Sequence, residues 1–231
     1  FYDHIGVGDS VNNSTGKCLV LITPDAERTM LTHLGISETL CRRSLDHATV
    51  ARSQFAYIEG YLVTSPTGRA AAIELRETAE KHGVKTALSL SDPGMVEFFG
   101  DGLREMLGNG VDLLFCNEHE AQGFTGTDNT QAAAEKLKQY ATTFAITCGA
   151  HGALVFDGSD MYAIEPHAVK AVDTNGAGDM FAGAFLYAIT HGYSYRDAGR
   201  LASRASAEVV SSYGPRLPAK KHAVIRQAVL G

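Results

Sequence analysis

Short apolar runs alternate with longer amphipathic segments along most of this chain. Runs rich in valine, isoleucine, leucine and phenylalanine predict buried strands, and longer segments with apolar residues at helical spacing predict helices. The predicted strands are 55–58, 85–90, 111–116, 144–147 and 153–156. One predicted helix follows the first strand, and a second begins at about 118. Four more span 130–140, 176–191, 195–211 and 219–230. This alternation predicts an α/β fold, in which a mostly parallel sheet carries helices on both faces.

Turn-forming and capping residues mark where some of these elements begin and end. Ser65 followed by Pro66 is typical of a helix start, and Gly83 is typical of the end of that helix. Closer to the N-terminus, the apolar segments 17–23 and 28–31 flank a turn that contains proline and aspartate, which predicts a hairpin. Ligands of parallel sheets bind beyond the carboxyl ends of the strands, so polar residues at those ends are the candidates for a site.

Composition limits the classes of partner. The chain has 231 residues, 45% of them hydrophobic, which suits one globular domain with a full core. Its net charge of −6 argues against nucleic acid as a partner, and the absence of a long apolar run argues against a membrane span. The four cysteines are scattered and form no CxxC pair, which favours a reducing, cytoplasmic location.

The most informative stretch is Asp173-Thr174-Asn175-Gly176-Ala177-Gly178-Asp179, directly before an apolar helix. Its glycines allow backbone N–H groups to gather around a negative charge at the start of that helix. Asp179 stands beside this position, where it could take a proton from an attacking hydroxyl. The pattern favours phosphoryl transfer to an alcohol. The alternative is a glycine-rich helix start that binds no ligand and in which the acid only caps the helix.

A second candidate site follows the strand 111–116, at Asn117-Glu118-His119-Glu120. Asn117 is placed to contact phosphate oxygens. Glu120 is placed to hold the water shell of Mg²⁺, a cation that usually keeps several of its waters. The alternative is an ordinary helix start, with Asn117 as the N-cap and the acids complementing the helix dipole. Both interpretations are open at this point.

A third candidate is the turn Thr147-Cys148-Gly149-Ala150-His151-Gly152, between two predicted strands. Its two glycines, Gly149 and Gly152, would let a nucleotide approach the backbone closely. A plain hairpin connection explains the same glycines equally well, because glycine turns are common.

These three stretches, in this order, resemble the motifs of the ribokinase-like (PfkB) carbohydrate kinases. Residues 173–185 resemble the C-terminal signature, Asn117 to Glu120 resemble the N-x-x-E motif, and Thr147 to Gly152 resemble the turn that contacts ATP. The resemblance covers nearly the whole chain. It implies a Rossmann-like α/β core with a small β-sheet lid, and it implies ATP and Mg²⁺ as co-reactants.

The resemblance also implies roles for single residues. Asp179 would be the catalytic base, and Gly176, Ala177 and Gly178 would form the anion hole for the transferred phosphoryl group. ATP would contact Asn117, Thr147, Gly149 and Gly152. Many family members bind a monovalent cation such as K⁺ beside the anion hole, at positions that correspond here to Asp173, Asn175, Val209 and Gly214.

The lid segment indicates a branch of the family. Residues 14–30 are similar to the lid of adenosine kinase-like members, and 213–217 resemble the same branch, so we assign 14–34 to the lid. The expected activity is transfer of the γ-phosphate of ATP to the primary hydroxyl of a nucleoside, most of all adenosine. The alternatives are a fructokinase- or ribokinase-type sugar kinase and a nucleotide-binding scaffold without catalysis. A homodimer formed through the lid is a further expectation. The opening Phe1-Tyr2 resembles a point inside the family's chain, so 1–231 is expected to be a kinase domain without its N-terminal part.

Overall fold

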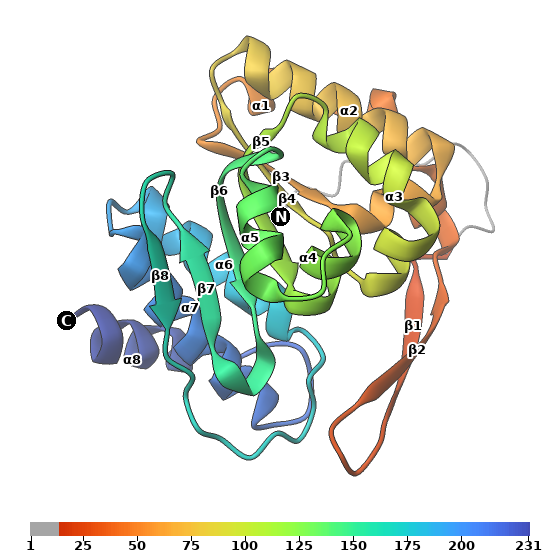
Figure 1. Ribbon diagram of the computed structural model, residues 1–231. Helices are drawn as coiled ribbons and strands as arrows, with labels where there is room; N and C mark the ends of the chain where they lie inside the picture. The colour runs from red at the N-terminus through yellow and green to blue at the C-terminus, as the bar shows by residue number, and fades with distance from the viewer. Residues whose placement is uncertain (1–13) are drawn as a thin grey trace.

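A six-stranded sheet forms the centre of the molecule, and a separate two-stranded hairpin projects beside it (Figure 1). The computed structural model describes residues 14–231, so the expected truncation at Phe1-Tyr2 lies outside the described residues. The strands are β1 (Lys17–Ile22), β2 (Arg28–His33), β3 (Phe55–Glu59), β4 (Lys85–Ser89), β5 (Val111–Asn117), β6 (Ala141–Thr147), β7 (Ala153–Phe156) and β8 (Met161–Ile164). The α-helices are α1 (His47–Val50), α2 (Pro66–Lys81), α3 (Pro93–Leu107), α4 (Glu118–Thr125), α5 (Thr130–Leu137), α6 (Ala177–Thr190), α7 (Tyr195–Val210) and α8 (Ala219–Leu230). The 3₁₀ helices are η1 (Gly35–Thr39), η2 (Arg42–Ser44), η3 (Gly60–Thr64) and η4 (Gly149–His151).

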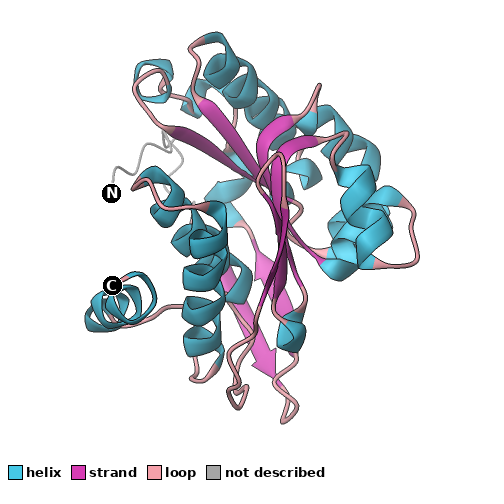
Figure 2. Cartoon of the chain, turned by 60° about the vertical axis from the view of Figure 1, so that its left-hand side comes forward, coloured by secondary structure: helices cyan, strands magenta, loops and turns pink. Residues whose placement is uncertain are grey.

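The large sheet follows chain order, β3-β4-β5-β6-β7-β8. Its first four strands are parallel, and β7 and β8 are antiparallel to their neighbours. Since crossovers between parallel strands are right-handed, a sheet that grows in one direction places α2 to α5 on the same face. Helices α6, α7 and α8 cover the other face, and Figure 2 shows helices on both sides of the strands. The predicted α/β fold with a small β lid is confirmed.

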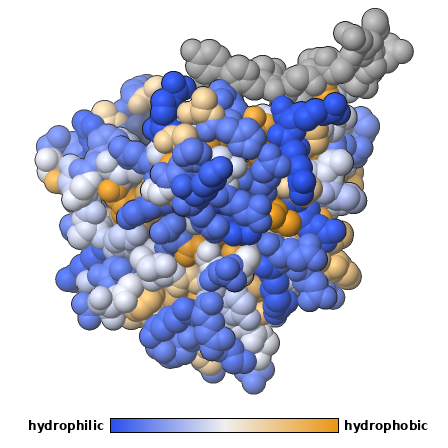
Figure 3. Space-filling view, turned by 90° about the horizontal axis from the view of Figure 1, so that it is seen from above, coloured by the Kyte–Doolittle hydropathy of each residue, from blue (hydrophilic) through white to orange (hydrophobic). Residues whose placement is uncertain are grey.

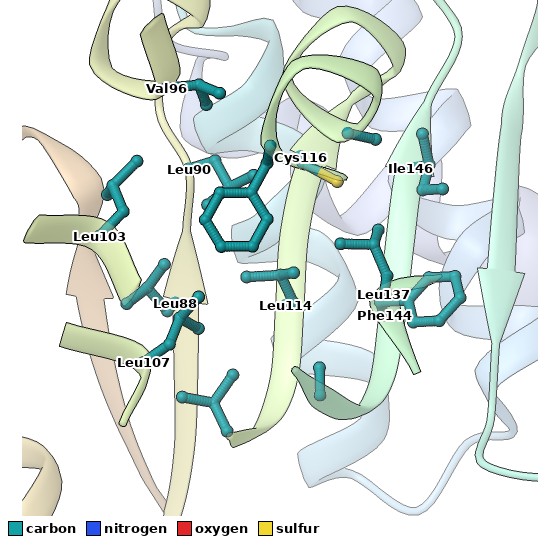
Figure 4. Close-up of a cluster of buried hydrophobic side chains, with 14 of the residues drawn as sticks. Leu88, Leu90, Val96, Leu103, Leu107, Leu114, Cys116, Leu137, Phe144 and Ile146 are labelled. Carbon is teal, nitrogen blue, oxygen red and sulfur yellow. The ribbon is translucent and has the colours of Figure 1, made fainter. Parts of the chain in front are cut away.

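Each face of the sheet has its own hydrophobic core, because side chains alternate along a strand. On β5, Leu114 points toward α2 to α5, whereas Leu113 and Phe115 point toward α6 and α7. Figure 4 shows the first core, where Leu88, Leu114 and Phe144 from three neighbouring strands are fully buried. In the second core the ring of Phe115 meets the edge of the buried Phe185 ring at a centroid distance of 5.6 Å. These cores anchor the strands, and with them the strand ends.

The sequence pattern did not predict the short helix α1, the 3₁₀ helices, helix α3 or strand β8. Helix α3 contains three glycines, which lower its intrinsic helix propensity. Packing explains one of them, because a Cβ on Gly102 would lie 2.5 Å from Val63 Cγ2. The helix nevertheless begins in a standard way, since Asp92 accepts a hydrogen bond from the N–H of Gly94 at 2.7 Å and Pro93 follows the cap. Strand β8 has only four residues and is held by its pairing with β7.

Polar side chains cover most of the outer surface. Figure 3 shows a face that is largely hydrophilic, with hydrophobic residues in small separate patches. Within residues 14–231, no helix is long and apolar enough to cross a bilayer.

Candidate active site

Two of the residues predicted to contact ATP lie at the carboxyl ends of parallel strands. Asn117 at the end of β5 and Thr147 at the end of β6 are direct partners in the parallel register. Glu59 and Ser89 are the corresponding pair at the ends of β3 and β4. Four strand ends therefore present polar side chains along one edge of the sheet, the edge at which α/β proteins bind ligands.

Helix α6 begins without a side-chain cap, so its first N–H groups have no side-chain partner among the described residues. Its N-cap, Gly176, has a φ of +77°, and a Cβ there would lie 2.6 Å from the carbonyl oxygen of Pro215. Only glycine fits this position without strain. Gly178 faces open space, and Asp179 is exposed beside it in the first turn. The structure thus brings the predicted anion hole and the predicted base together at one helix start.

The loop before α6 is held by a buried carboxylate. Asp173 is only 2% exposed, and its two oxygens accept hydrogen bonds from the N–H groups of Asn175 at 2.9 Å and Gly214 at 2.8 Å. Three of the four residues predicted to hold a monovalent cation therefore meet. The fourth, Val209, directs its carbonyl to the N–H of Ser212 at the end of α7, at 3.2 Å. The cation assignment stays a prediction.

Asn117 and Glu120 form a reciprocal capping box at the start of α4. The Asn117 side-chain oxygen accepts from the N–H of Glu120 at 2.8 Å. The Glu120 carboxylate in turn accepts from the backbone N–H of Asn117 at 2.9 Å and from its side-chain amide at 2.7 Å. The capping interpretation therefore describes this structure. The roles of Asn117 toward ATP and of Glu120 toward Mg²⁺ stay predictions.

The charge state of Glu120 is unusual for a capping residue. Burial, and to a smaller extent the negative charge of Asp92, raise the pKa of this carboxyl to about 7 against the opposing effects of the Asn117 backbone hydrogen bond and the positive charge of Arg28. Among residues 14–231, no group of three or more His, Cys, Asp or Glu side chains could hold a metal ion by itself. A single buried carboxyl of this kind is suited to contact, through water, a Mg²⁺ ion that is already bound to the phosphates of a nucleotide.

The turn after β6 is shaped mainly by its contact with β8. A Cβ on Gly152 would lie 2.0 Å from the carbonyl oxygen of Ile164, and the Gly152 φ is +88°. The Gly152 carbonyl also accepts from the N–H of Cys148 at 2.8 Å, which closes the turn. Gly149 has a φ of +53° and open space around it. The close packing supports the plain-turn interpretation for Gly152, and the contact of this turn with ATP stays a prediction.

Comparison with known proteins decides the family. The model of the pfkB family carbohydrate kinases matches residues 3–222. The chain belongs to the pfkB family of carbohydrate kinases. An adenosine kinase from Dictyostelium discoideum is 31% identical over 229 residues, which cover 90% of this chain and 65% of that protein. The chain therefore spans less than two thirds of the length of this pfkB relative.

Solved pfkB-type structures share the fold. Adenosine kinase from Sinorhizobium meliloti superposes with a TM-score of 0.88 at 32% identity, covering 93% of this chain and 66% of that one. An Escherichia coli protein assigned as a ribokinase II, in complex with ATP and Mg²⁺, superposes with a TM-score of 0.82 at 19% identity, covering 94% and 72%. At that identity the second likeness shows the fold alone.

Two groups near this pfkB site were missed by sequence reasoning. Arg28, at the start of β2, donates from Nη1 to Thr174 Oγ1 at 3.2 Å, which places a cation beside the loop before α6. No local signal marks it, because the contact joins residues 146 positions apart. Glu59 ends β3 just as Asn117 ends β5, so its position at a strand end could have indicated it.

The surroundings of Glu59 are acidic. Ser91, which has an unusual positive φ of 72°, donates from its hydroxyl to Glu59 Oε2 at 3.0 Å. Burial raises the pKa of Glu59, and the negative charge of Asp179 raises it further. Tyr61 in η3 is close enough to be affected by the same charge: partial burial, with the negative charges of Asp92, Glu120 and Asp179, raises its pKa to about 12. The predicted base therefore lies near the end of β3, close enough to Glu59 for its charge to act there.

The first prediction concerns the glycines at the start of α6. Gly176→Ala should lower the free energy of unfolding by about 1 kcal/mol or more, because alanine must adopt a left-handed backbone against Pro215. Gly178→Ala is the matched control and should leave the stability unchanged or slightly higher, since its Cβ would meet open space within a helix. Denaturant unfolding of both variants measures the difference, and equal stabilities would contradict the described turn.

The second prediction concerns the buried carboxyl of Glu120. Its native pKa of about 7 lies above the value of 4.5 for an unperturbed glutamate, so the native state keeps a proton that the unfolded state has lost. The free energy of unfolding should therefore fall as the pH rises from about 4.5 to 7, by no more than about 3 kcal/mol. Glu120→Gln should remove this fall when both proteins are unfolded by urea without Mg²⁺. A parallel pH dependence in the two proteins would show that the carboxyl is not perturbed.

Proposed function

We propose that this protein is a kinase that transfers the γ-phosphate of ATP to the primary hydroxyl of a nucleoside, with adenosine as the preferred acceptor. The observation that carries the proposal is the uncapped, glycine-built start of α6 with Asp179 in its first turn, at the carboxyl edge of the parallel strands. Membership of the pfkB family and similarity to adenosine kinases support the same reaction and acceptor.

In the proposed reaction, Asp179 accepts the proton of the acceptor hydroxyl. The acceptor oxygen forms a bond to the γ-phosphorus while the bond from that phosphorus to the bridging oxygen breaks, and ADP leaves with the electron pair. The N–H groups at Gly176, Ala177 and Gly178, of which that of Ala177 donates to the Thr174 carbonyl in this structure, would stabilise the negative charge on the transferred group. Arg28 adds a positive charge on the lid side. Positioning and charge stabilisation supply most of the catalysis in such transfers.

ATP and Mg²⁺ are the co-reactants that this family membership implies, and the fold neighbour from Escherichia coli holds both. Asn117, Thr147, Gly149 and Gly152 would contact the nucleotide along the ends of β5 and β6. Glu120 would act on Mg²⁺ through water, which suits a buried carboxyl whose pKa is raised. The metal would screen the phosphates from the acidic strand ends. The K⁺ site at Asp173 is the least supported part of the proposal, since both of its oxygens already accept N–H groups.

The surroundings of the site agree with two further expectations. Three leucines of the hairpin are exposed: Leu19, Leu21 and Leu31, with exposed fractions of 60%, 49% and 56%. Such exposed apolar side chains support a contact between the lids of two copies of the protein. All four cysteines, which lie in the described part of the chain, are free thiols, and this supports a reducing compartment such as the cytoplasm.

An acceptor competition tests the proposed function. The protein is incubated with ATP, Mg²⁺ and equal concentrations of adenosine, ribose and fructose, and the phosphorylated products are quantified by mass spectrometry. Adenosine 5′-phosphate should be the main product. A preference for either free sugar would assign the protein to the sugar kinases, and an absence of any product would leave only nucleotide binding.

The role of Asp179 is tested by Asp179→Asn, which keeps the size of the side chain but removes the base. Turnover should fall by about 10²–10⁴-fold, the usual contribution of a general base. The affinity for ATP should persist, because the proposed phosphate contacts are backbone N–H groups and Asn117. Asp197→Asn is the matched control, since Asp197 is an acid in the first turn of α7, and its turnover should equal that of the unchanged protein. Normal turnover in Asp179→Asn would refute the assignment of the base.

A further inference from the structure

The tip of the hairpin is fastened to the loop that precedes α6 by a single hydroxyl. Thr174 Oγ1 donates to the carbonyl oxygen of Ala26 at 3.0 Å and accepts from Arg28 Nη1 at 3.2 Å. Within residues 14–231, the residues of the hairpin, 17–33, form no other hydrogen bond to the rest of the molecule. One side chain thus supplies the polar connection between the hairpin and the body.

The hairpin tip is shaped for this contact. Ala26 is only 3% exposed, although Asp25 and Glu27 on either side of it are exposed. Its φ of +67° is a left-handed conformation that alanine rarely adopts. The turn is closed by hydrogen bonds from the N–H of Ala26 to the Thr23 carbonyl and from the N–H of Thr23 to the Glu27 carbonyl, both at 2.9 Å. This left-handed backbone directs the Ala26 carbonyl toward Thr174, and the hydrogen bond to Thr174 helps to stabilise the strained conformation.

Thr174 belongs both to the contact with the hairpin and to the turn at which α6 begins. Thr174 lies two residues before Gly176, and its own carbonyl accepts the N–H of Ala177 at 3.3 Å. Its side chain therefore faces the hairpin while its backbone forms part of the turn that opens α6. Arg28 is held by the same hydroxyl, and its charge reaches far enough to act on Glu120 at the end of β5.

We propose that Thr174 is a positioning residue that couples the docking of the hairpin to the completion of the phosphoryl-transfer site. Its hydroxyl orients the guanidinium of Arg28 toward the start of α6 and at the same time holds the Ala26 carbonyl. When the hairpin docks, the site gains the positive charge of the Arg28 guanidinium and is covered by the hairpin at the same time. The inference rests on the proposed function for its catalytic part, whereas the docking contact itself is independent of the reaction.

Loss of this hydroxyl has a defined consequence in the proposed reaction. An undocked hairpin would leave Arg28 unoriented, so transfer to the acceptor would slow. It would also admit water, which could attack the γ-phosphorus in place of the acceptor hydroxyl and release ADP and inorganic phosphate. The ratio of hydrolysis to transfer therefore reports on the docking.

The test compares Thr174→Val, which keeps the shape but loses both hydrogen bonds, with Thr174→Ser, which keeps the hydroxyl. Thr32→Val is the control on the same hairpin, because Thr32 Oγ1 donates only to Cys18 Sγ, at 3.4 Å. Amide hydrogen exchange over residues 23–28 is measured without ligands. Exchange should become about tenfold faster in Thr174→Val, as the loss of one or two net hydrogen bonds predicts, and should be unchanged in the other two variants.

Kinetics with ATP and adenosine supply the second readout. Thr174→Val should lower kcat about tenfold with little change in the KM for adenosine and should raise the fraction of ATP that is hydrolysed, and Thr174→Ser should restore both. Unchanged hydrogen exchange in Thr174→Val would overturn the docking contact. Faster exchange with normal kcat and normal hydrolysis would overturn the positioning role. A complete lack of transfer by the unchanged protein would refute the proposed function instead, and the exchange measurement would still decide the docking.

Discussion

The buried carboxylate of Asp173 is the interaction on which the site depends. It receives one N–H group from the loop before α6 and one from the segment after α7, and so joins two parts of the chain that are 41 residues apart. A carboxylate that is 2% exposed is costly unless its oxygens are satisfied, and here each oxygen has a backbone donor. Because the loop is fixed in this way, Gly176 can take its left-handed conformation against Pro215, and α6 can begin without a side-chain cap.

The same edge of the sheet carries several carboxyl groups, whose negative charges would repel the phosphates of a nucleotide. Burial raises the pKa values of Glu59 and Glu120, and the negative charge of Asp179 adds to the rise at Glu59 as that of Asp92 does at Glu120. A polyphosphate would be repelled by this edge unless positive groups lie between them. The helix start, Arg28 and a cation carried by the phosphates are the groups placed to do so. The acidic edge and the positive helix start thus favour a metal-bound nucleotide over a free one.

Local patterns predicted every strand except β8, and the three motifs, because each is encoded in consecutive residues. Asn117 and Thr147 follow apolar runs, and parallel strands necessarily bring their carboxyl ends to one edge. Helix α3 was missed because its three glycines lower the helix propensity, and only one of them, Gly102, is explained by packing, against Val63 in a distant segment. The contacts of Arg28 and Ala26 with Thr174 were missed for the same reason, since they span 146 and 148 positions and have no periodicity. The strained backbone at Ser91 also has no sequence signal.

The structure divides the site between a rigid part and a part held by few contacts. The strand ends and α6 are anchored by two packed cores, so their geometry is expected to persist whether or not a ligand is bound. The hairpin is a two-stranded ribbon with most of its side chains exposed, and such ribbons have little stability of their own. Its position beside the loop before α6 is therefore set by its contacts with Thr174 rather than by its own folding. In the proposed reaction, a hairpin held in this way could open for exchange of ligands at small cost, while the groups proposed to stabilise the transferred phosphoryl charge stay in position.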